Sequence, residues 1–129
     1  MRTHTSSIQI DAPATEVQAI VADLDQLPHW AVGFAKAVER DGDGHMVTLM
    51  SGERMPIAVA TDPQAGTVDF VAGGVPAYTR TVAVDGGCVH TFTMEQGPGQ
   101  PDEQFDGQIA ALGHELTMLK AIAEATCPL

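Results

Sequence analysis

The sequence has few aromatic, few basic and few sulfhydryl side chains. Aromatic residues make up 5% of the 129 residues, with one tryptophan, Trp30, and one tyrosine, Tyr78. Hydrophobic residues still make up 44% and charged residues 18%, which is typical of a globular domain and excludes a disordered chain. Because no Ser/Gly linker or repeat divides the chain, we expect residues 1–129 to form one domain.

Basic residues are too few for several classes of partner. Six Lys and Arg residues stand against 17 Asp and Glu residues, and the net charge is −11. A nucleic-acid-binding protein needs a cationic surface for the phosphate backbone, so we expect no nucleic-acid partner. Anionic membrane surfaces are disfavoured for the same reason. The start of the chain has no apolar signal-peptide core and no apolar run could cross a bilayer, so we expect no stable membrane insertion.

The cysteines and histidines show no metal-binding pattern. Cys88 and Cys127 are far apart and form no CxxC motif, and two free thiols are typical of a cytoplasmic protein. The five histidines show no HxH or HxxxH pair. The segment HELTM (114–118) lacks the second histidine of a zinc-protease motif. We therefore expect no metal and no cofactor.

Hydrophobic periodicity predicts the elements of the first two thirds of the chain. Residues 3–11 alternate and predict a strand. Residues 12–24 predict a short helix with Val17, Ile20 and Val21 on one side, and Asp23 is suited to cap a second short helix at 24–30. Residues 35–96 are rich in Val, Ile, Thr and Met and predict six antiparallel strands. The turn signals between them are DGDG (41–44), SGE (51–53), DPQAG (62–66), AGGVP (72–76) and DGG (85–87).

Residues 102–125 predict one long helix. Its apolar side chains recur at helical spacing and form a single stripe: Phe105, Ile109, Leu112, Leu116, Leu119 and Ala123. The order of elements predicts an α+β fold, in which one antiparallel sheet covers the apolar stripe of this helix. A curved sheet around a helix leaves a natural space for an apolar ligand.

Three segments carry a resemblance to a known superfamily. They are SIQIDAPATEVQAIVADLDQLPHWAVGFAKAV (7–38), GGCVHTFTM (86–94) and FDGQIAALGHELTMLKAIAE (105–124). Together they resemble the helix-grip fold of the SRPBCC/START/Bet v 1-like superfamily, which includes polyketide cyclase/dehydrase-like proteins. The resemblance implies a seven-stranded curved antiparallel sheet around a long C-terminal helix, and a hydrophobic or amphipathic ligand. Gln18 departs from the pattern, since this place is often aromatic in the family.

The last predicted hairpin determines which side chains face the helix. With DGG (85–87) as a three-residue loop, a threonine ladder faces solvent, as a polar ladder should. A two-residue loop would mix polar and apolar residues on both faces, so we expect the longer loop. The inward-facing pairs are then Val84 with Cys88, Val82 with His90, Arg80 with Phe92, and Tyr78 with Met94.

The predicted cavity is lined by these inward-facing residues, by the two strands before them and by the long helix. Trp30 packs as a core anchor that also forms part of the cavity wall. The predicted ligand-binding residues are Trp30, Phe34, Met55, Ile57, Phe70, Tyr78, Arg80, His90, Phe92, Met94, Phe105, Ile109, Leu112 and Leu116.

Arg80, His90 and Tyr78 are polar residues on an otherwise apolar face, and two interpretations stay open. In the structural interpretation, Arg80 reaches the sheet edge or pairs with a carboxylate such as Glu115, and His90 is a hydrogen-bonded core histidine. In the functional interpretation, Arg80 and His90 orient the polar end of a ligand. As catalytic candidates, His90 would be the general acid or base, and Arg80 or Tyr78 would polarise a carbonyl.

Three functions are compatible with the sequence. The favoured hypothesis is binding of a small hydrophobic or amphipathic molecule, such as a lipid, with a homodimer allowed. The second is a polyketide cyclase/aromatase/dehydratase-type enzyme that uses the same cavity. The third is a structural or interaction module with a collapsed cavity. The interior distinguishes them, because only the enzyme requires two titratable groups aimed at one point.

Overall fold

The computed structural model describes residues 1–129, and the whole chain forms one curved sheet and three α-helices. The strand order is β1-β7-β6-β5-β4-β3-β2, and all neighbours are antiparallel. The strands are β1 (Thr3–Ile10), β2 (Ala35–Asp41), β3 (Gly44–Leu49), β4 (Arg54–Asp62), β5 (Thr67–Ala72), β6 (Val75–Val84) and β7 (Gly87–Glu95). The helices are α1 (Ala14–Ala22), α2 (Leu27–Trp30) and α3 (Asp102–Thr126). The predicted α+β helix-grip architecture is therefore confirmed.

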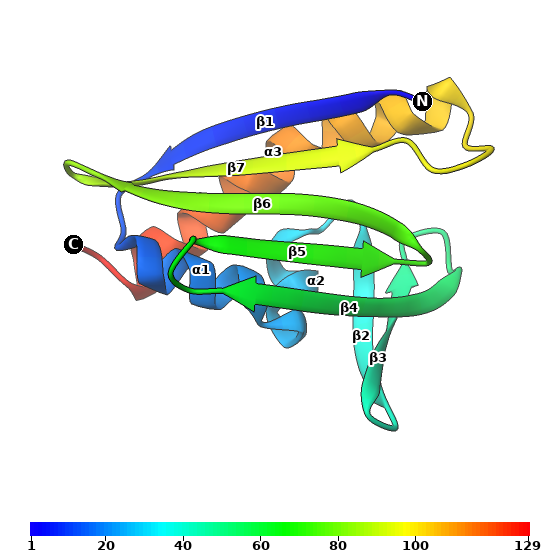
Figure 1. Cartoon of the computed structure of the whole chain (residues 1–129), viewed down its shortest axis with the longest axis horizontal. Coiled ribbons are helices and arrows are strands. Elements are labelled where there is room, and N and C mark those ends of the chain that lie inside the picture. Colours follow the sequence, from blue (N-terminus) through cyan, green and yellow to red (C-terminus); the bar gives the residue numbers. More distant parts are fainter.

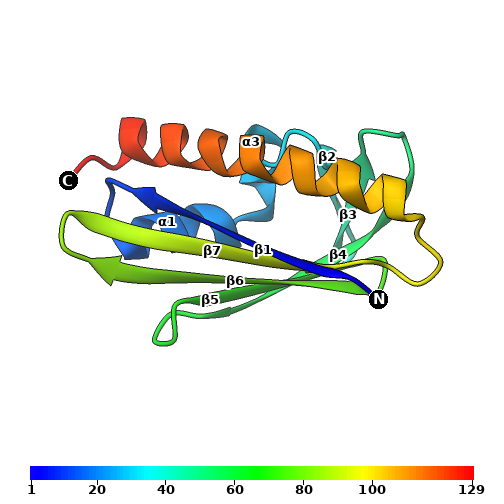
Figure 2. The same cartoon turned by 90° about the horizontal axis from the view of Figure 1, so that it is seen from above.

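The sheet is strongly bent, and this bend creates space above its inner face. The β2–β3 hairpin runs across the direction of β4–β7 (Figure 1). Seen from above, α3 lies along the concave side, and α1 and α2 lie between α3 and the sheet at one end (Figure 2). The core forms where these layers meet, with fully buried residues that include Ile10, Val17 and Leu119.

The first helix shows how the departure at Gln18 is accommodated. Val17 and Val21 are fully buried, as the apolar spacing predicts. Gln18 is buried too, and its Nε2 donates hydrogen bonds to the carbonyls of Asp62 at 3.1 Å and Thr67 at 3.4 Å. A buried amide is stable when its polar atoms are paired. Gln18 therefore ties α1 to the β4–β5 turn by hydrogen bonds.

The second helical segment is split into two short pieces. Residues Leu24–Gln26 form a 3₁₀ turn before α2 begins at Leu27. The predicted N-cap is confirmed, because the Asp23 carboxylate accepts a hydrogen bond of 3.0 Å from the Asp25 backbone N–H. The segment buries Trp30, which is 1% exposed.

The predicted register of the β6–β7 hairpin is wrong by one residue. Val84 pairs with Gly87, so the loop consists of Asp85 and Gly86 alone, with Gly86 at a positive φ of 80°. Because side chains alternate across a strand, this shift exchanges the faces of β6. It leaves β7 as predicted, with Cys88 and His90 buried on the inner face.

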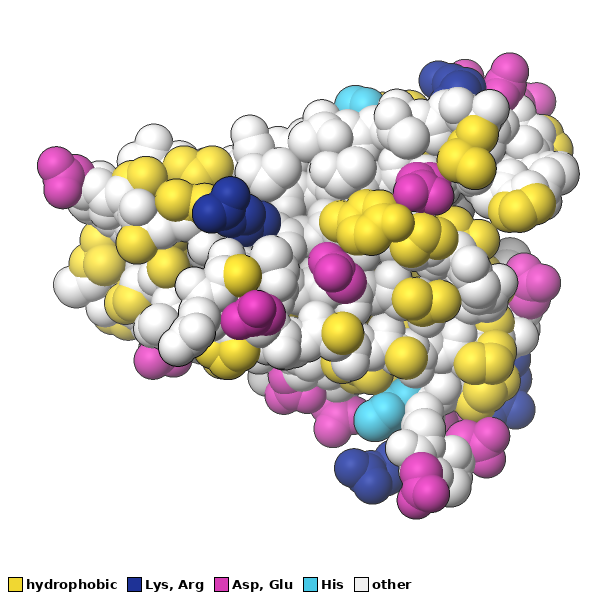
Figure 3. Space-filling model, viewed as in Figure 1, with side chains coloured by type: hydrophobic (Ala, Val, Ile, Leu, Met, Phe, Trp, Pro, Cys, Tyr) yellow, Lys and Arg dark blue, Asp and Glu magenta, His cyan; other side chains and the backbone are white.

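The exchange moves Tyr78 and Arg80 to the outer face. Both side chains are exposed, together with Val82 and Val84. On the face of the molecule shown in Figure 3, hydrophobic side chains interrupt a polar surface. Thr79 and Thr81 point inward instead, being 3% and 7% exposed.

Hydrogen bonds explain why threonines occupy the inner face of β6. The Thr79 hydroxyl donates to the Val68 carbonyl at 2.8 Å. The Thr81 hydroxyl lies 2.9 Å from His90 Nδ1. A hydroxyl with a partner inside the protein needs no water, so the threonine ladder does not mark a solvated face. Helices cover part of this inner face, and none of them combines the length and apolar content needed to cross a membrane.

Candidate functional site

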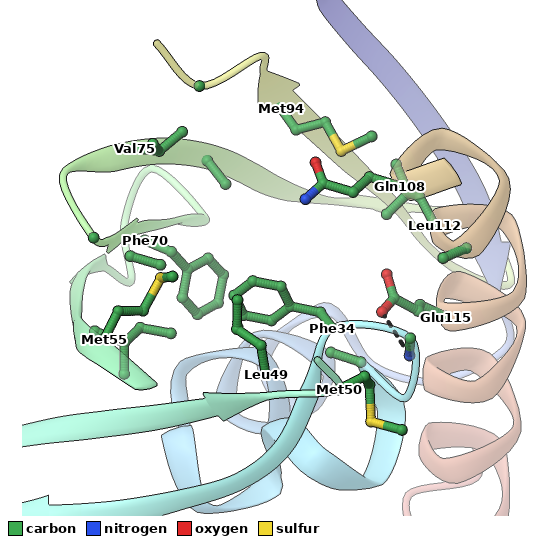
Figure 4. A pocket seen from close by; sticks show the side chains of 18 of the residues that line it. Phe34, Leu49, Met50, Met55, Phe70, Val75, Met94, Gln108, Leu112 and Glu115 are labelled. Atoms are coloured by element: carbon green, nitrogen blue, oxygen red, sulfur yellow. Dashed lines mark hydrogen bonds between the residues drawn. The ribbon is translucent and has the colours of Figure 1, made fainter. Parts of the chain in front are cut away.

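A cavity of about 490 Å³ lies between the inner face of the sheet and α3. Its volume is in the range of about 300–1,000 Å³ that is usual for small-molecule sites. Most of its lining residues are hydrophobic. Figure 4 shows the cavity with the side chains of the sheet on one side and those of α3 on the other.

The wall formed by the sheet is apolar and partly aromatic. Met55, Ile57, Phe70, Phe92 and Met94 all line it, because each occupies an inward position of β4, β5 or β7. The Phe70 and Phe92 rings stack with their centroids 6.5 Å apart. Trp30 meets the edge of Phe92, also at 6.5 Å. The three rings therefore form one packed aromatic cluster in this wall.

The wall formed by α3 is more polar. The residues that line it are spaced three or four apart, as one face of a helix requires: Gln104, Gly107, Gln108, Ala111, Leu112 and Glu115. This face lies about 90° around the helix from the apolar stripe, taking 100° per residue, and Leu112 belongs to both. Small and amide side chains at this spacing are the sequence signal for the polar wall. A prediction based on apolar residues alone does not include them.

Glu115 is the titratable group deepest in the cavity. The residue is 7% exposed, and its Oε2 accepts a hydrogen bond of 3.1 Å from the Gly33 backbone N–H. Burial raises the pKa of the Glu115 carboxyl to about 7, with the backbone N–H groups of Gly33 and Phe34 opposing the rise. Near neutral pH this carboxyl is therefore divided between its acid and carboxylate forms. The predicted pairing of Glu115 with Arg80 is wrong, because Arg80 lies on the outer face.

The exposed lining residues mark the mouth of the cavity. Met50 and Glu53 lie beyond β3, Gly73 lies in the β5–β6 turn, and Gln104 and Gly107 lie on the first turns of α3. The turn AGGVP (72–76) is at this rim, as the sequence indicates. Met50 is 56% exposed, so an apolar side chain stands at the entrance.

His90 lies outside the cavity lining. It is fully buried, and its only hydrogen-bond partner is the Thr81 hydroxyl, while Nε2 has none. Burial lowers the pKa of His90 to about 4, so the ring is neutral at physiological pH. This environment matches the interpretation of His90 as a core histidine.

The structure brings together eight of the predicted ligand-binding residues and excludes the others from the lining. Those that line the cavity are Trp30, Phe34, Met55, Ile57, Phe70, Phe92, Met94 and Leu112. Those that do not are Tyr78, Arg80, His90, Phe105, Ile109 and Leu116. Besides the polar wall of α3, the sequence did not indicate Leu49, Met50 or Val75 as part of the site.

The apolar stripe of α3 packs mainly on the sheet and not on the cavity. Phe105 is fully buried beneath Arg2, whose Cζ lies 5.2 Å from the ring centroid. Arg2 also pairs with Asp106 at 2.7 Å, which fastens the start of β1 to the start of α3. Phe105, Ile109 and Leu116 share this side of the helix. The prediction that they line the cavity is wrong. A helix that faces a bent sheet has two buried sides, and in α3 one of them packs on β1 while the other faces the cavity.

Trp30 supplies a spectroscopic test of its place in the cavity wall. Because it is the only tryptophan and lines the cavity, a compound that enters should change its fluorescence, through displaced solvent or direct ring contact. We expect a shift in Trp30 emission that saturates with the stoichiometry measured by calorimetry. Calorimetric binding that leaves the emission unchanged would place the compound elsewhere.

The titratable and thiol side chains of the chain are dispersed. No group of three or more His, Cys, Asp or Glu side chains lies close enough together to hold a metal ion. Cys88 is buried with a raised thiol pKa, so its sulfur is kept as the less reactive thiol. The polar side-chain groups of the lining include the Glu115 carboxyl, the glutamine amides and the Trp30 indole N–H, which has no hydrogen-bond partner.

Solved structures share this fold across nearly the whole chain. No protein-family model and no curated protein sequence matches the chain. A START superfamily protein from Mycobacterium smegmatis is 14% identical with a TM-score of 0.72, covering 95% of this chain and 97% of its own. The Aha1 dimer from Colwellia psychrerythraea is 17% identical with a TM-score of 0.71, covering 96% and 97%.

A third neighbour is the di-domain aromatase/cyclase BexL from the BE-7585A biosynthetic pathway. It is 18% identical with a TM-score of 0.74, and the match covers 94% of this chain and 46% of BexL. At such low sequence identity, the similarity to these three structures shows the fold and does not identify a ligand. The chain has the helix-grip fold of START-like and SRPBCC proteins.

Proposed function

We propose that the protein binds a small hydrophobic or amphipathic molecule in the cavity between the sheet and α3. The observation that carries this proposal is the cavity itself, with about 490 Å³ of space behind mostly hydrophobic walls. Protein interiors are otherwise packed to the density of organic crystals, so an open apolar space of this size is costly unless a ligand fills it. The START-like neighbour has the same architecture.

The two alternative functions have less support. A module with a collapsed interior does not fit, because the cavity is open. A cyclase, aromatase or dehydratase is favoured by the likeness to BexL. Its three predicted catalytic candidates, His90, Arg80 and Tyr78, all lie outside the lining, however, and Glu115 is left as the one deep titratable group. General acid–base chemistry with two partners has no second group here.

Location and assembly are a separate part of the proposal. Cys88 and Cys127 are free, and free thiols persist in reducing compartments, which supports the cytoplasm as the place of action. The cavity is enclosed by a single chain. A monomer and a homodimer, the state named for the Aha1 neighbour, can therefore both bind.

The direct test is native mass spectrometry of the purified protein. We expect an additional mass that is lost on denaturation and extracted into organic solvent. The delipidated protein should then gain thermal stability with apolar compounds, since a ligand that binds only the native state raises the unfolding temperature. A protein without co-purified mass that no apolar compound stabilises would refute the proposal.

Gly107 and Gly113 form a matched pair for blocking the cavity. Both glycines are in α3, and a Cβ added at either meets no atom within 4 Å, but only Gly107 lines the cavity. We expect Gly107→Leu to weaken ligand binding by about tenfold or more, because the new side chain takes ligand space. Replacing a helical glycine stabilises the helix by up to about 1 kcal/mol, so the loss would not come from unfolding.

The control is Gly113→Leu, which lies about 180° from the cavity face. It should gain the same helix stability and bind with parental affinity in calorimetric titration. Equal affinities of the two variants would show that the ligand does not occupy the space in front of Gly107.

A further inference from the structure

The ionisable side chains that line the cavity are all acidic. No Lys, Arg or His side chain lines it. The ionisable lining residues are Glu53, Glu95 and Glu115. The whole chain adds a net charge of −11. A carboxylate or phosphate on a ligand would therefore find no cation to pair with, and burying it unpaired would be costly.

Of the three glutamates, only Glu115 presents its carboxyl to the interior. Glu53 is exposed at the rim. Glu95 accepts a hydrogen bond of 3.2 Å from the Tyr78 hydroxyl, and Tyr78 lies on the outer face. The carboxyl of Glu95 is therefore outside, and Glu115 is the one ionisable group deep in the cavity.

One oxygen of Glu115 is held and the other is free. Oε2 accepts the Gly33 N–H at 3.1 Å, and the Phe34 N–H also acts on this carboxyl. The Gly33 bond to Oε2 is the one hydrogen bond of normal length that the carboxyl makes, so Oε1 is left open. Figure 4 shows this second oxygen directed into the cavity, below Gln108. A carboxyl of a buried residue, anchored at one oxygen and open at the other, is prepared to accept a hydrogen bond from a ligand.

Two glutamine amides of α3 continue the polar side of the cavity from Glu115 toward the mouth. Gln104 and Gln108 lie on the same helical face as Glu115, about three and two turns before it, and both line the cavity. Neither side-chain amide is bonded within the protein, in contrast to Gln100, whose Oε1 accepts from the Gly97 N–H. Their carbonyl oxygens are free to accept from the N–H groups of an entering molecule, and their NH₂ groups are free to donate to its uncharged oxygens.

We propose, on the basis of the proposed function, that the ligand is an apolar molecule with a protonated amine, and that the amine binds Glu115. The apolar part lies against the Phe70 and Phe92 wall, and the ammonium group donates to the free Glu115 oxygen. Molecules with the same apolar part and a carboxylate are rejected. The cavity therefore selects its ligands by the sign of their charge.

The protonation of Glu115 supports this assignment. Burial raises its pKa to about 7, and no charged side chain contributes to the shift. The cavity lining holds no cationic side chain. Its uncharged polar side chains are the glutamine amides, Ser51 and the Trp30 indole, and the other two glutamates, Glu53 and Glu95, contribute nothing to the shift. A bound ammonium would supply the missing countercharge and lower this pKa. Binding below neutral pH therefore releases a proton from the protein.

The test uses three probes that share an alkyl chain: decylamine, decanol and decanoate, each kept below its micelle concentration. Calorimetry at neutral pH should give the order decylamine, decanol, decanoate, with about tenfold between the first two, as expected for a charge-assisted hydrogen bond. Titrations of decylamine at pH 6 in buffers of different ionisation enthalpy should show proton release, with no release for decanol.

Glu115→Gln should bind decanol as the parent does and lose the preference for decylamine. Glu103→Gln removes the same charge from the exposed first turn of α3, outside the cavity lining, and is the matched control, which should keep the parental order. Decanoate binding as well as decylamine, or a preference that survives Glu115→Gln, overturns the inference and leaves the proposed function intact. Failure of all three probes, the neutral alcohol included, overturns both.

Discussion

Glu115→Gln is expected to be more stable than the parent protein by about 3 kcal/mol near pH 8 and equally stable near pH 4. Glu115 is 7% exposed, and burial raises the pKa of its carboxyl from 4.5 to about 7. Above neutral pH the parent must keep a carboxylate away from water without a cationic partner. Glutamine has nearly the same shape, remains neutral and keeps an oxygen for the Gly33 N–H.

The sign follows from proton uptake in the two states. Between about pH 4.5 and 7, the unfolded chain releases the proton of Glu115 while the native protein retains it, so the native state binds more protons. The contribution of Glu115 to the free energy of unfolding therefore falls as pH rises through this window and is constant above it. In Glu115→Gln this decrease is absent.

Urea denaturation of both proteins from pH 4 to pH 8 measures the difference directly. Glu53→Gln is the control for removing one negative charge, because Glu53 is exposed at the cavity rim and forms no ion pair. The difference in the free energy of unfolding between Glu115→Gln and the parent should grow with pH. A constant difference would show that water solvates the native carboxyl and that its pKa is not raised.

The sequence predicts the fold well because each element has its own periodicity. Ile8 and Ile10 mark the inner face of β1, and Met55, Ile57 and Phe70 mark the inner faces of β4 and β5. Alternation of this kind depends only on neighbouring residues. The aromatic wall of the cavity could therefore be predicted from the sequence alone.

The polar part of the site could not be predicted in the same way. The face of β6 depends on whether Thr79 and Thr81 find partners, and these partners, Val68 and His90, lie on other strands. The role of Glu115 depends on the Gly33 N–H, which is distant in sequence. Buried polar groups are satisfied by hydrogen bonds between segments that are distant in the sequence. A local sequence pattern cannot predict such bonds.

As the pH is lowered from about 7 to about 4, the free energy of unfolding of His90→Gln is expected to rise by about 3 kcal/mol relative to that of the parent. His90 is fully buried, and burial lowers its pKa from 6.5 to about 4. As pH falls through this window, the unfolded chain takes up a proton on His90 and the native protein does not. The unfolded state is then favoured, so the parent loses stability, whereas a glutamine that hydrogen-bonds Thr81 cannot titrate.

The measurement is again urea denaturation across this pH range, with His114→Gln on the exposed surface of α3 as the control. At neutral pH, His90→Gln reports only the change in packing, so its pH-dependent part is separated from any loss of core contacts. A constant difference between His90→Gln and the parent from pH 7 to pH 4 would show that water reaches the ring or that Nε2 has a partner.

The two buried groups act in opposite directions over the same range. Between about pH 4.5 and 6.5, the parent gains stability with rising pH through His90 and loses it through Glu115, and each slope corresponds to one proton. The two contributions nearly cancel, so the parent curve alone would hide both. Relative to the parent, we therefore expect stability to rise with pH in Glu115→Gln and to fall with pH in His90→Gln. When both substitutions are combined, the pH dependence should return close to that of the parent.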